Sequence, residues 1–219
     1  MSASSPVRAS RRITPARVAL ASAVAVVGVS LTGMAVFAGL NAVATNTTAQ
    51  SVASGTMSLT LAAGSGSAGF STGISGLAPG DTVDRYVDLT NGGTIAGTAL
   101  TLGASDSSAT TLSTDATKGL HVTVTQCTTA WVSGTCGDQS PAVLADSVPL
   151  ATLTSTPTTL VSGAIAAGAV LHLQVAVQLP DITETVTNGQ LPTGTIQGKS
   201  ASITWTFTEQ QRTAATTSS

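Results

Sequence analysis

Charged side chains are scarce in this 219-residue sequence: they make up 8% of the chain, whereas 42% of its residues are hydrophobic. Half of the eight basic residues precede position 18. Residues 45–219 therefore carry four basic against ten acidic side chains, a net charge of −6. Binding to nucleic acid or to anionic lipid draws on clustered lysine and arginine. The shortage of basic residues predicts that residues 45–219 bind neither.

Sequence motifs of the common hydrolases are absent as well. The chain has two histidines, His121 and His172, and neither belongs to the H-E-x-x-H pattern of zinc proteases. It contains no G-x-S-x-G motif and no glycine-rich phosphate loop. Both histidines fall on strand positions that are expected to face solvent, so we interpret them as surface residues. The sequence predicts no catalytic, cofactor-binding or metal-binding residues, and a protein that is not an enzyme.

Three acidic residues, Asp81, Asp84 and Asp88, gather around Arg85. Carboxylate oxygens suit calcium, so a calcium site is one interpretation of this cluster. The D-x-D-x-D-G spacing of a calcium loop is missing, however. Asp81 also follows a Pro-Gly pair, and we therefore interpret it more simply as a turn former.

One long hydrophobic run is present, the 23 uncharged residues from Val18 to Leu40. Four arginines precede it, and small residues of the A-x-A type follow it. This order is typical of a secretory signal, whose basic end stays in the cytoplasm while the apolar part enters the bilayer. We expect cleavage after Ala44, with Ala35 and Ala38 as alternatives. A retained anchor is the competing interpretation, because 23 residues can span a bilayer; in both cases the remaining chain lies outside the cell.

After residue 45 the hydrophobic pattern is that of short strands, and no stretch predicts a long helix. From Val170 to Leu179 apolar and polar side chains alternate, and the same alternation recurs from Ala201 to Thr208. Alternation at period two buries one face of a strand and exposes the other. Single helical turns are expected within 106–117 and 142–146. The other expected strands are Thr56–Leu61, Thr82–Thr90, Thr98–Leu102, Leu120–Gln126, Val148–Leu153 and Thr158–Val161.

These strands, about eight in all, are joined by turn signals such as Pro79-Gly80-Asp81 and Asn188-Gly189. Short connections between strands with one buried face predict an all-β fold of antiparallel sheets. Two such sheets packed face to face form a β-sandwich, here of jelly-roll type. We divide the chain into a signal peptide (1–44), a flexible N-terminal arm (45–54), a β-sandwich domain (55–210) and a disordered tail (211–219).

The two cysteines, Cys127 and Cys136, are nine positions apart, with Gly134 between them. In an exported chain an isolated pair at this spacing predicts a structural disulfide. A redox or metal pair is the alternative, but the spacing is not C-x-x-C and no second pair completes a zinc site. Trp131 lies inside the loop, and we expect it to pack over the disulfide rather than to bind a ligand.

Several short motifs resemble the TasA/camelysin (CalY) family of exported matrix-fibre proteins. Residues 33–37 (G-M-A-V-F) are similar to the end of that family's signal, and residues 53–59 (A-S-G-T-M-S-L) to its opening strand. Residues 77–83 (L-A-P-G-D-T-V) and 89–94 (L-T-N-G-G-T) are similar to its Pro-Gly-Asp and Asn-x-Gly-Thr motifs. The acidic residue that usually follows the signal's phenylalanine is replaced here by Ala38.

The resemblance implies a jelly-roll domain that assembles into extracellular fibres. In that family the arm of one subunit completes the sheet of the next, because unpaired backbone groups at a sheet edge accept an incoming strand. Here the arm is residues 45–54, the expected partner is another copy or a homologous matrix subunit, and membrane contact is limited to the export signal before cleavage. Two alternatives stay open: a monomeric module that binds a glycan or protein through its loops, Tyr86 and Trp131, and, more remotely, a metalloprotease.

Overall fold

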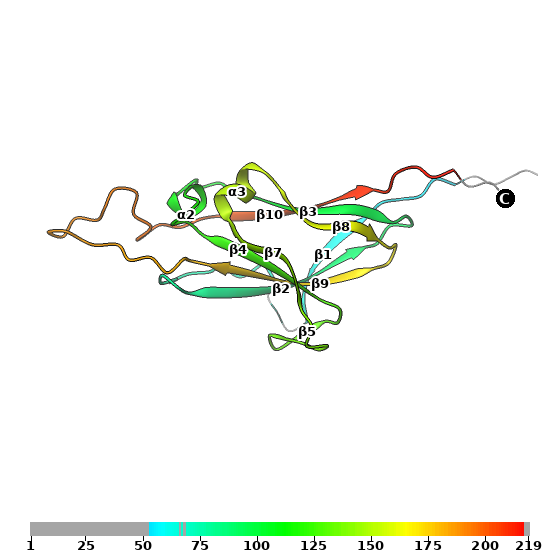
Figure 1. Ribbon diagram of the computed structural model, residues 1–219, viewed down its shortest axis with the longest axis horizontal. Helices are drawn as coiled ribbons and strands as arrows, with labels where there is room; N and C mark the ends of the chain where they lie inside the picture. The colour runs from blue at the N-terminus through cyan, green and yellow to red at the C-terminus, as the bar shows by residue number, and fades with distance from the viewer. Residues whose placement is uncertain (1–52, 66, 68, 217–219) are drawn as a thin grey trace, which may run out of the picture. The chain divides into compact units, whose positions relative to one another are not determined.

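The computed structural model describes residues 53–65, 67 and 69–216 (Figure 1). The predicted signal peptide, its cleavage site at Ala44 and all but the last two residues of the arm lie outside the described residues. Residues Ser54–Ser219 form one compact unit. Within the described residues, no helix has the length and apolar character needed to cross a membrane.

Strands dominate the described part of the chain, and its two helices are short. In chain order the elements are β1 (Leu59–Ala63), β2 (Thr82–Asn91), β3 (Gly97–Asp106), α2 (Thr111–Thr114), β4 (His121–Cys127), β5 (Trp131–Val132), β6 (Thr135–Cys136), β7 (Ala142–Pro149), α3 (Leu150–Ser155), β8 (Thr158–Ile165), β9 (Val170–Gln178) and β10 (Ile203–Gln211).

Two antiparallel sheets form the sandwich (Figure 1). The five-stranded sheet has the order β1-β2-β9-β4-β7, and the three-stranded sheet has the order β10-β3-β8. Across the described strands, the chain passes between the two sheets five times, and one of these crossings, from β7 to β8, is made by α3. A separate two-stranded hairpin, β5-β6, projects from the end of β4. This arrangement confirms the predicted all-β, antiparallel sandwich.

The core lies between the two sheets and follows the predicted alternation. On β9, the side chains of Leu173, Val175 and Val177 are almost fully buried. They face Leu100 and Leu102 of β3 across the sandwich, within one continuous hydrophobic cluster. β9 is central in its sheet, between β2 and β4, so its inner face is covered along its length. The clearest alternation in the sequence therefore corresponds to the most enclosed strand.

Residues 142–155 reverse the predicted order of helix and strand. The helical turn predicted at 142–146 is wrong, because Ala142–Pro149 is β7 and pairs with β4. The strand predicted at Val148–Leu153 is also wrong, because α3 begins at Leu150. Leu150 and Leu153 are three positions apart, which places both on the buried face of a helix. The helical turn expected within 106–117 is confirmed by α2.

Both ends of the compact unit leave the sandwich beside the turn between β2 and β3. The N–H of Thr94 donates to the carbonyl of Thr56, and the N–H of Arg212 donates to the carbonyl of Ala96. β10 continues to Gln211, one residue into the predicted tail. β2 and β10 both begin at the opposite end of the sandwich, about 30 Å away at the usual rise per strand residue.

Candidate functional site

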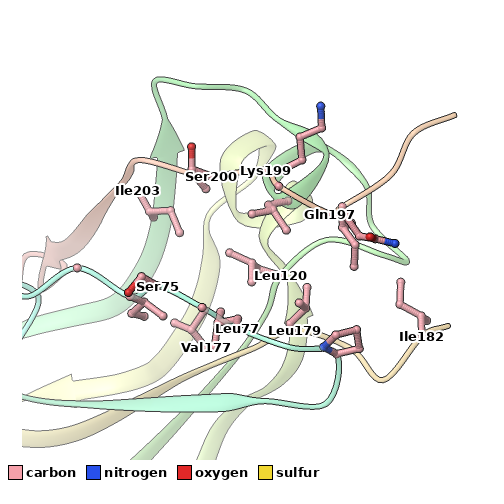
Figure 2. A pocket seen from close by; sticks show the side chains of 18 of the residues that line it. Ser75, Leu77, Leu120, Val177, Leu179, Ile182, Gln197, Lys199, Ser200 and Ile203 are labelled. Atoms are coloured by element: carbon pink, nitrogen blue, oxygen red, sulfur yellow. The ribbon is translucent and has the colours of Figure 1, made fainter. Parts of the chain in front are cut away.

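A cleft of about 900 Å³ opens at the end of the sandwich where β2 and β10 begin (Figure 2). Its surface comes from both sheets and is more apolar than polar. The residues that form it include Leu120 before β4, Val177 and Leu179 at the end of β9, and Ile203 and Trp205 at the start of β10. A concave apolar surface of this size is typical of a site that receives a ligand or a peptide.

One wall of the cleft is the segment that leads from β1 into β2, here called the 70–79 segment. Its first residue, Phe70, stacks on two aromatic rings of β10, with centroid distances of 5.6 Å to Trp205 and 6.5 Å to Phe207. Its second apolar contact is made by Leu77, which packs against the core. In Figure 2 Leu77 lies between Ile203 of β10 and the end of β9. The segment therefore crosses the space between the two sheets.

Arg85 of β2 forms hydrogen bonds with the backbone of the 70–79 segment. Its guanidinium donates to the carbonyls of Thr72 and Gly73, at 3.1 Å and 3.5 Å. Between Ala63 and Thr82 the described residues form no strand. The segment is therefore held by side-chain contacts rather than by a sheet ladder.

The opposite wall is the connection from β9 to β10, and Glu184 gives this wall its shape. Its carboxylate accepts hydrogen bonds from the hydroxyl of Thr195 at 2.6 Å and from the N–H of Ile196 at 3.1 Å. The Thr195 hydrogen bond is the largest of the effects that lower the pKa of Glu184. The buried side chain of Ile196 faces the cleft. An ionised carboxylate thus fixes the turn that closes the cleft.

The rim of the cleft carries both signs of charge. Arg85 and Lys199 are its basic residues, and Asp181 and Glu184 are its acidic residues. The charges balance, so the rim does not select for an anion or a cation. The apolar interior and the backbone groups of the two walls are what an occupant would contact.

A small hydrophobic cluster around the disulfide covers part of the outer face of the five-stranded sheet. Cys127 and Cys136 form the predicted disulfide, and Trp131 is buried against it. The ring of Trp131 also contacts Tyr86, with centroids 5.4 Å apart. Burial raises the pKa of the Tyr86 hydroxyl, and the charge of Asp84 adds to the rise. Trp131 is only 6% exposed, which confirms the packing role and leaves little of its ring for a ligand.

The two histidines lie on neighbouring strands but do not meet. In the β4–β9 ladder His121 is opposite Gln178, whereas His172 is opposite Cys127. Six strand positions separate them, which corresponds to about 20 Å. The Nδ1 atom of His172 lies 2.6 Å from Oδ1 of Asp88, so this histidine is paired and half-buried. His172 lies on the outward side of β9, as the sequence predicts, but it is not fully solvated, because the register of β2 on β9 brings Asp88 beside it.

His121 contacts a serine hydroxyl at the sheet edge. Its Nδ1 lies 3.0 Å from Oγ of Ser147, and its Nε2 lies 3.1 Å from the carbonyl oxygen of Ala116. A serine beside an oriented imidazole is the starting arrangement for a nucleophile. Ser147 is exposed, however, and neither residue lines the cleft described above. We interpret the pair as a surface hydrogen bond, as the sequence led us to expect for His121.

One group of metal-ligand atoms comes together in the described residues: the sulfurs of Cys127 and Cys136 and the carboxylate of Asp138. The two sulfurs are bonded to each other, so neither is available as a thiolate, the form of cysteine that binds metals. Among the predicted calcium ligands, Asp81 accepts a hydrogen bond from the N–H of Ala78, which confirms the turn-forming role. Asp88 instead pairs with His172.

Comparison with known proteins decides the family. The model of the camelysin metallo-endopeptidase family matches residues 15–216. The chain belongs to the camelysin family. No curated protein matches the sequence significantly. At a coarse level, camelysin membership identifies an exported protein of the cell surface, in agreement with the resemblance noted in the sequence.

The name of the camelysin family implies a catalytic metal, but the described residues do not fit one. A peptidase zinc site needs three protein ligands, of histidine or carboxylate type, around one open position. The two histidines of the chain are about 20 Å apart along the ladder. The one close group of three possible ligands contains the disulfide. We therefore derive no reaction step through a metal.

The cleft was not among the sites that the sequence predicted. Residues 70–79 and 181–200, which form most of its two walls, carry no strand periodicity, so the sequence predicts only connections there. The available signals were weak: a lone Phe70 among glycines and serines, and an unusually long stretch between the last two strands. Neither signal shows that the two connections lie at the same end of the sandwich.

Proposed function

We propose that this camelysin-family protein is a structural subunit of the cell surface or its matrix and not an enzyme. Residues 45–54 of one copy add as a strand to the open edge of β10 in the next copy. The edge position of β10 supports this proposal. β10 pairs with β3 on one side and ends the three-stranded sheet on the other. Unpaired backbone groups on such an edge are satisfied by an incoming strand.

The length of β10 and the positions of the chain ends also support this proposal. β10 has nine residues, close to the ten residues of the predicted arm. The arm joins the unit at Ser54, beside the β2–β3 turn, whereas the cleft and the start of β10 lie at the opposite end. The arm and the edge of β10 are unlike surfaces of one subunit, so a contact between them joins copies head to tail and grows into a filament if it does not close.

Assembly of purified protein tests the proposal. Residues 45–219 and a second protein lacking 45–54 are compared by sedimentation and negative-stain electron microscopy over a concentration series. We expect filaments from the longer protein and monomers from the shorter one. Equal assembly of the two proteins would refute the arm mechanism. A monomer at every concentration, for both, would refute self-assembly and leave a filament that needs a homologous subunit.

A ligand-binding module is the second candidate, and the 900 Å³ cleft is the observation that favours it. Trp131 is too enclosed to serve in such a site, so the cleft residues replace it as the candidate contact surface. Saturable binding of a glycan or a peptide by a protein that stays monomeric would support this function over the structural one.

The peptidase function has a direct test. Purified protein is analysed for bound zinc and assayed on an unfolded protein substrate, with and without a chelator. We expect no stoichiometric zinc and no chelator-sensitive cleavage. Cleavage that is lost on chelation and restored by zinc would overturn the non-enzymatic proposal.

A further inference from the structure

Phe70 packs on the inner face of β10, the strand that ends the three-stranded sheet. Its ring stacks on Trp205 and Phe207, the two aromatic side chains that β10 turns toward the core. Residues directly opposite each other on neighbouring strands bring their side chains within about 5 Å. An inward side chain of a strand added beside β10 would therefore meet the same two rings. Phe70 and such a side chain compete for one position.

The rest of the 70–79 segment is lightly held. Residues 71–76 are exposed, and Ile74 among them keeps 37% of its surface in solvent. A Cβ placed on Gly73 or Gly76 would meet no atom within 4 Å, so there is open space on that side of the backbone at both positions. Gly76 also has a positive φ, which glycine adopts at little cost. Phe70, Leu77 and the Arg85 hydrogen bonds are among the contacts that hold the segment in place.

We propose that the 70–79 segment is an internal placeholder, in which Phe70 covers the receiving face of β10 in the free subunit and must leave before another strand can add. This inference rests on the proposed function and describes what inhibits assembly of the free subunit. Strand addition is then an exchange, in which the Phe70 ring leaves β10 and residues 45–54 of the next copy bind there. The free subunit keeps its aromatic face covered, and assembly begins when the segment moves away.

The free and the assembled subunit are stabilised by different kinds of interaction. Displacing Phe70 loses a large aromatic contact with two rings. The incoming residues 45–54 have only small apolar side chains, Ala49, Val52 and Ala53, to replace it. They gain in return main-chain hydrogen bonds along β10. Removing the aromatic contact in advance therefore favours the assembled state and lowers the barrier to reach it.

Assembly rates of placeholder variants test this inference. Phe70→Ala removes the ring. Arg85→Gln loosens the same segment by removing its hydrogen bonds to Thr72 and Gly73, and it serves as a second variant if Phe70→Ala folds poorly. Val132→Ala, an exposed apolar truncation on the β5–β6 hairpin, is the control. At equal concentrations we expect Phe70→Ala to form filaments about five- to tenfold faster than the parent, the factor that corresponds to an aromatic contact of about 1–1.4 kcal/mol. Arg85→Gln should show a smaller acceleration, and Val132→Ala none.

A second measurement follows the ring itself. Trp205 fluorescence, in a Trp131→Phe background, is recorded while a synthetic peptide of residues 45–54 is added to protein lacking its own arm. Binding should perturb Trp205 and should be tighter in Phe70→Ala. Filaments from the parent with unchanged rates and unchanged peptide affinity in both variants would overturn the placeholder and leave the proposed function intact. Absence of filaments and of peptide binding in all proteins would overturn both.

Discussion

The indole N–H of Trp131 donates to the backbone carbonyl of His172 across 41 positions of sequence, at 3.1 Å. This bond joins the β5–β6 hairpin to β9 in the centre of the five-stranded sheet. Trp131 in turn packs on the disulfide that closes the hairpin. The disulfide therefore holds a small loop in place and also positions the side chain that covers this part of the outer face.

Removal of the disulfide should lower stability without abolishing the fold. For a loop of nine positions the chain-entropy estimate is about 2–3 kcal/mol in the free energy of unfolding. We expect Cys127→Ser/Cys136→Ser to show a loss of that size in urea titrations, and reduced parent protein to show the same loss. Identical midpoints for the oxidised parent and the double variant would show that the bond contributes nothing.

The carboxylate of Asp138 should slow reduction of the disulfide. Its Oδ1 atom lies 2.7 Å from Sγ of Cys136, and the hydroxyl of Thr128 donates to Oδ2. The Thr128 hydrogen bond is the largest of the effects that lower the pKa of Asp138, so the group is ionised at neutral pH. A thiolate must approach a disulfide sulfur to reduce it. Repulsion by Asp138 opposes that approach.

Asp138→Asn should therefore be reduced by an anionic thiol about three to five times faster at low salt, with a smaller difference at high salt. The rate is followed by mass spectrometry of alkylated protein. Asp146→Asn, an exposed carboxylate on β7, is the matched control and should reduce at the parent rate. A rate for Asp138→Asn that does not depend on salt would argue against an electrostatic cause.

Glu209 on β10 should make the protein less stable as the pH rises. Both carboxylate oxygens are enclosed and have no hydrogen-bond partner among the described residues. Burial raises the pKa of Glu209. The folded state then binds the proton more tightly than the unfolded state, so stability is highest below the unfolded pKa, near pH 4, and falls as pH rises through the folded pKa.

Glu209→Gln removes this charge, so it should unfold at a higher urea concentration than the parent at pH 7, and the difference should vanish toward pH 4. Glu184→Gln is the control of opposite sign, because the pKa of Glu184 is lowered. Its carboxylate stabilises the fold above the unfolded pKa, so this variant should lose stability at pH 7. Parallel pH profiles for Glu209→Gln and the parent would contradict the prediction.

Asp106 links the end of β3 to the residue before β10 by a hydrogen bond. Its carboxylate accepts hydrogen bonds from the backbone N–H groups of Ser108 and Ser202 and from the hydroxyl of Ser113. Burial alone would raise the pKa of Asp106, but these bonds together outweigh burial and lower the pKa. Its contribution is therefore present above the unfolded pKa and is lost as pH falls through the folded pKa.

Asp106→Ala should cost about 1–3 kcal/mol at pH 7, since it leaves several donors without a charged acceptor. The cost should shrink as the parent's own carboxylate is protonated in acid. Thermal unfolding from pH 7 to pH 3 measures both effects. Asp181→Ala, whose carboxylate lies on the rim of the cleft, gives the baseline for removing an acidic side chain near the same end of the sandwich.

The sequence predicted best those elements whose pattern is local. β9 was predicted at Val170–Leu179 and lies at Val170–Gln178, because a central strand alternates without interruption. The prediction for 142–155 failed because Val148 and Leu150 have the spacing of a strand face whereas Leu150 and Leu153 have that of a helix face, and pairing with β4 decides where the strand ends. The disulfide was predictable because an exported chain with only two cysteines, close together in the sequence, can form only one disulfide within itself.

The cleft and the outer-face contacts depend on register, which composition does not encode. Asp88 and His172 are 84 positions apart, and they meet because β2 and β9 pair with that offset. Phe70 reaches Trp205 only because a patternless connection folds back across the sandwich. These relationships link distant segments, and a single sequence carries no signal for such a link.

The placement of both chain ends beside the β2–β3 turn, with the cleft at the far end, gives any head-to-tail assembly a direction. One tip of a filament would present a free arm, and the other would present a β10 edge that has received no arm. The tips would then grow at different rates, as in other polar polymers. A subunit without residues 45–54 could still receive an arm but could not offer one. In trace amounts it would terminate elongation at a single tip and shorten the filaments.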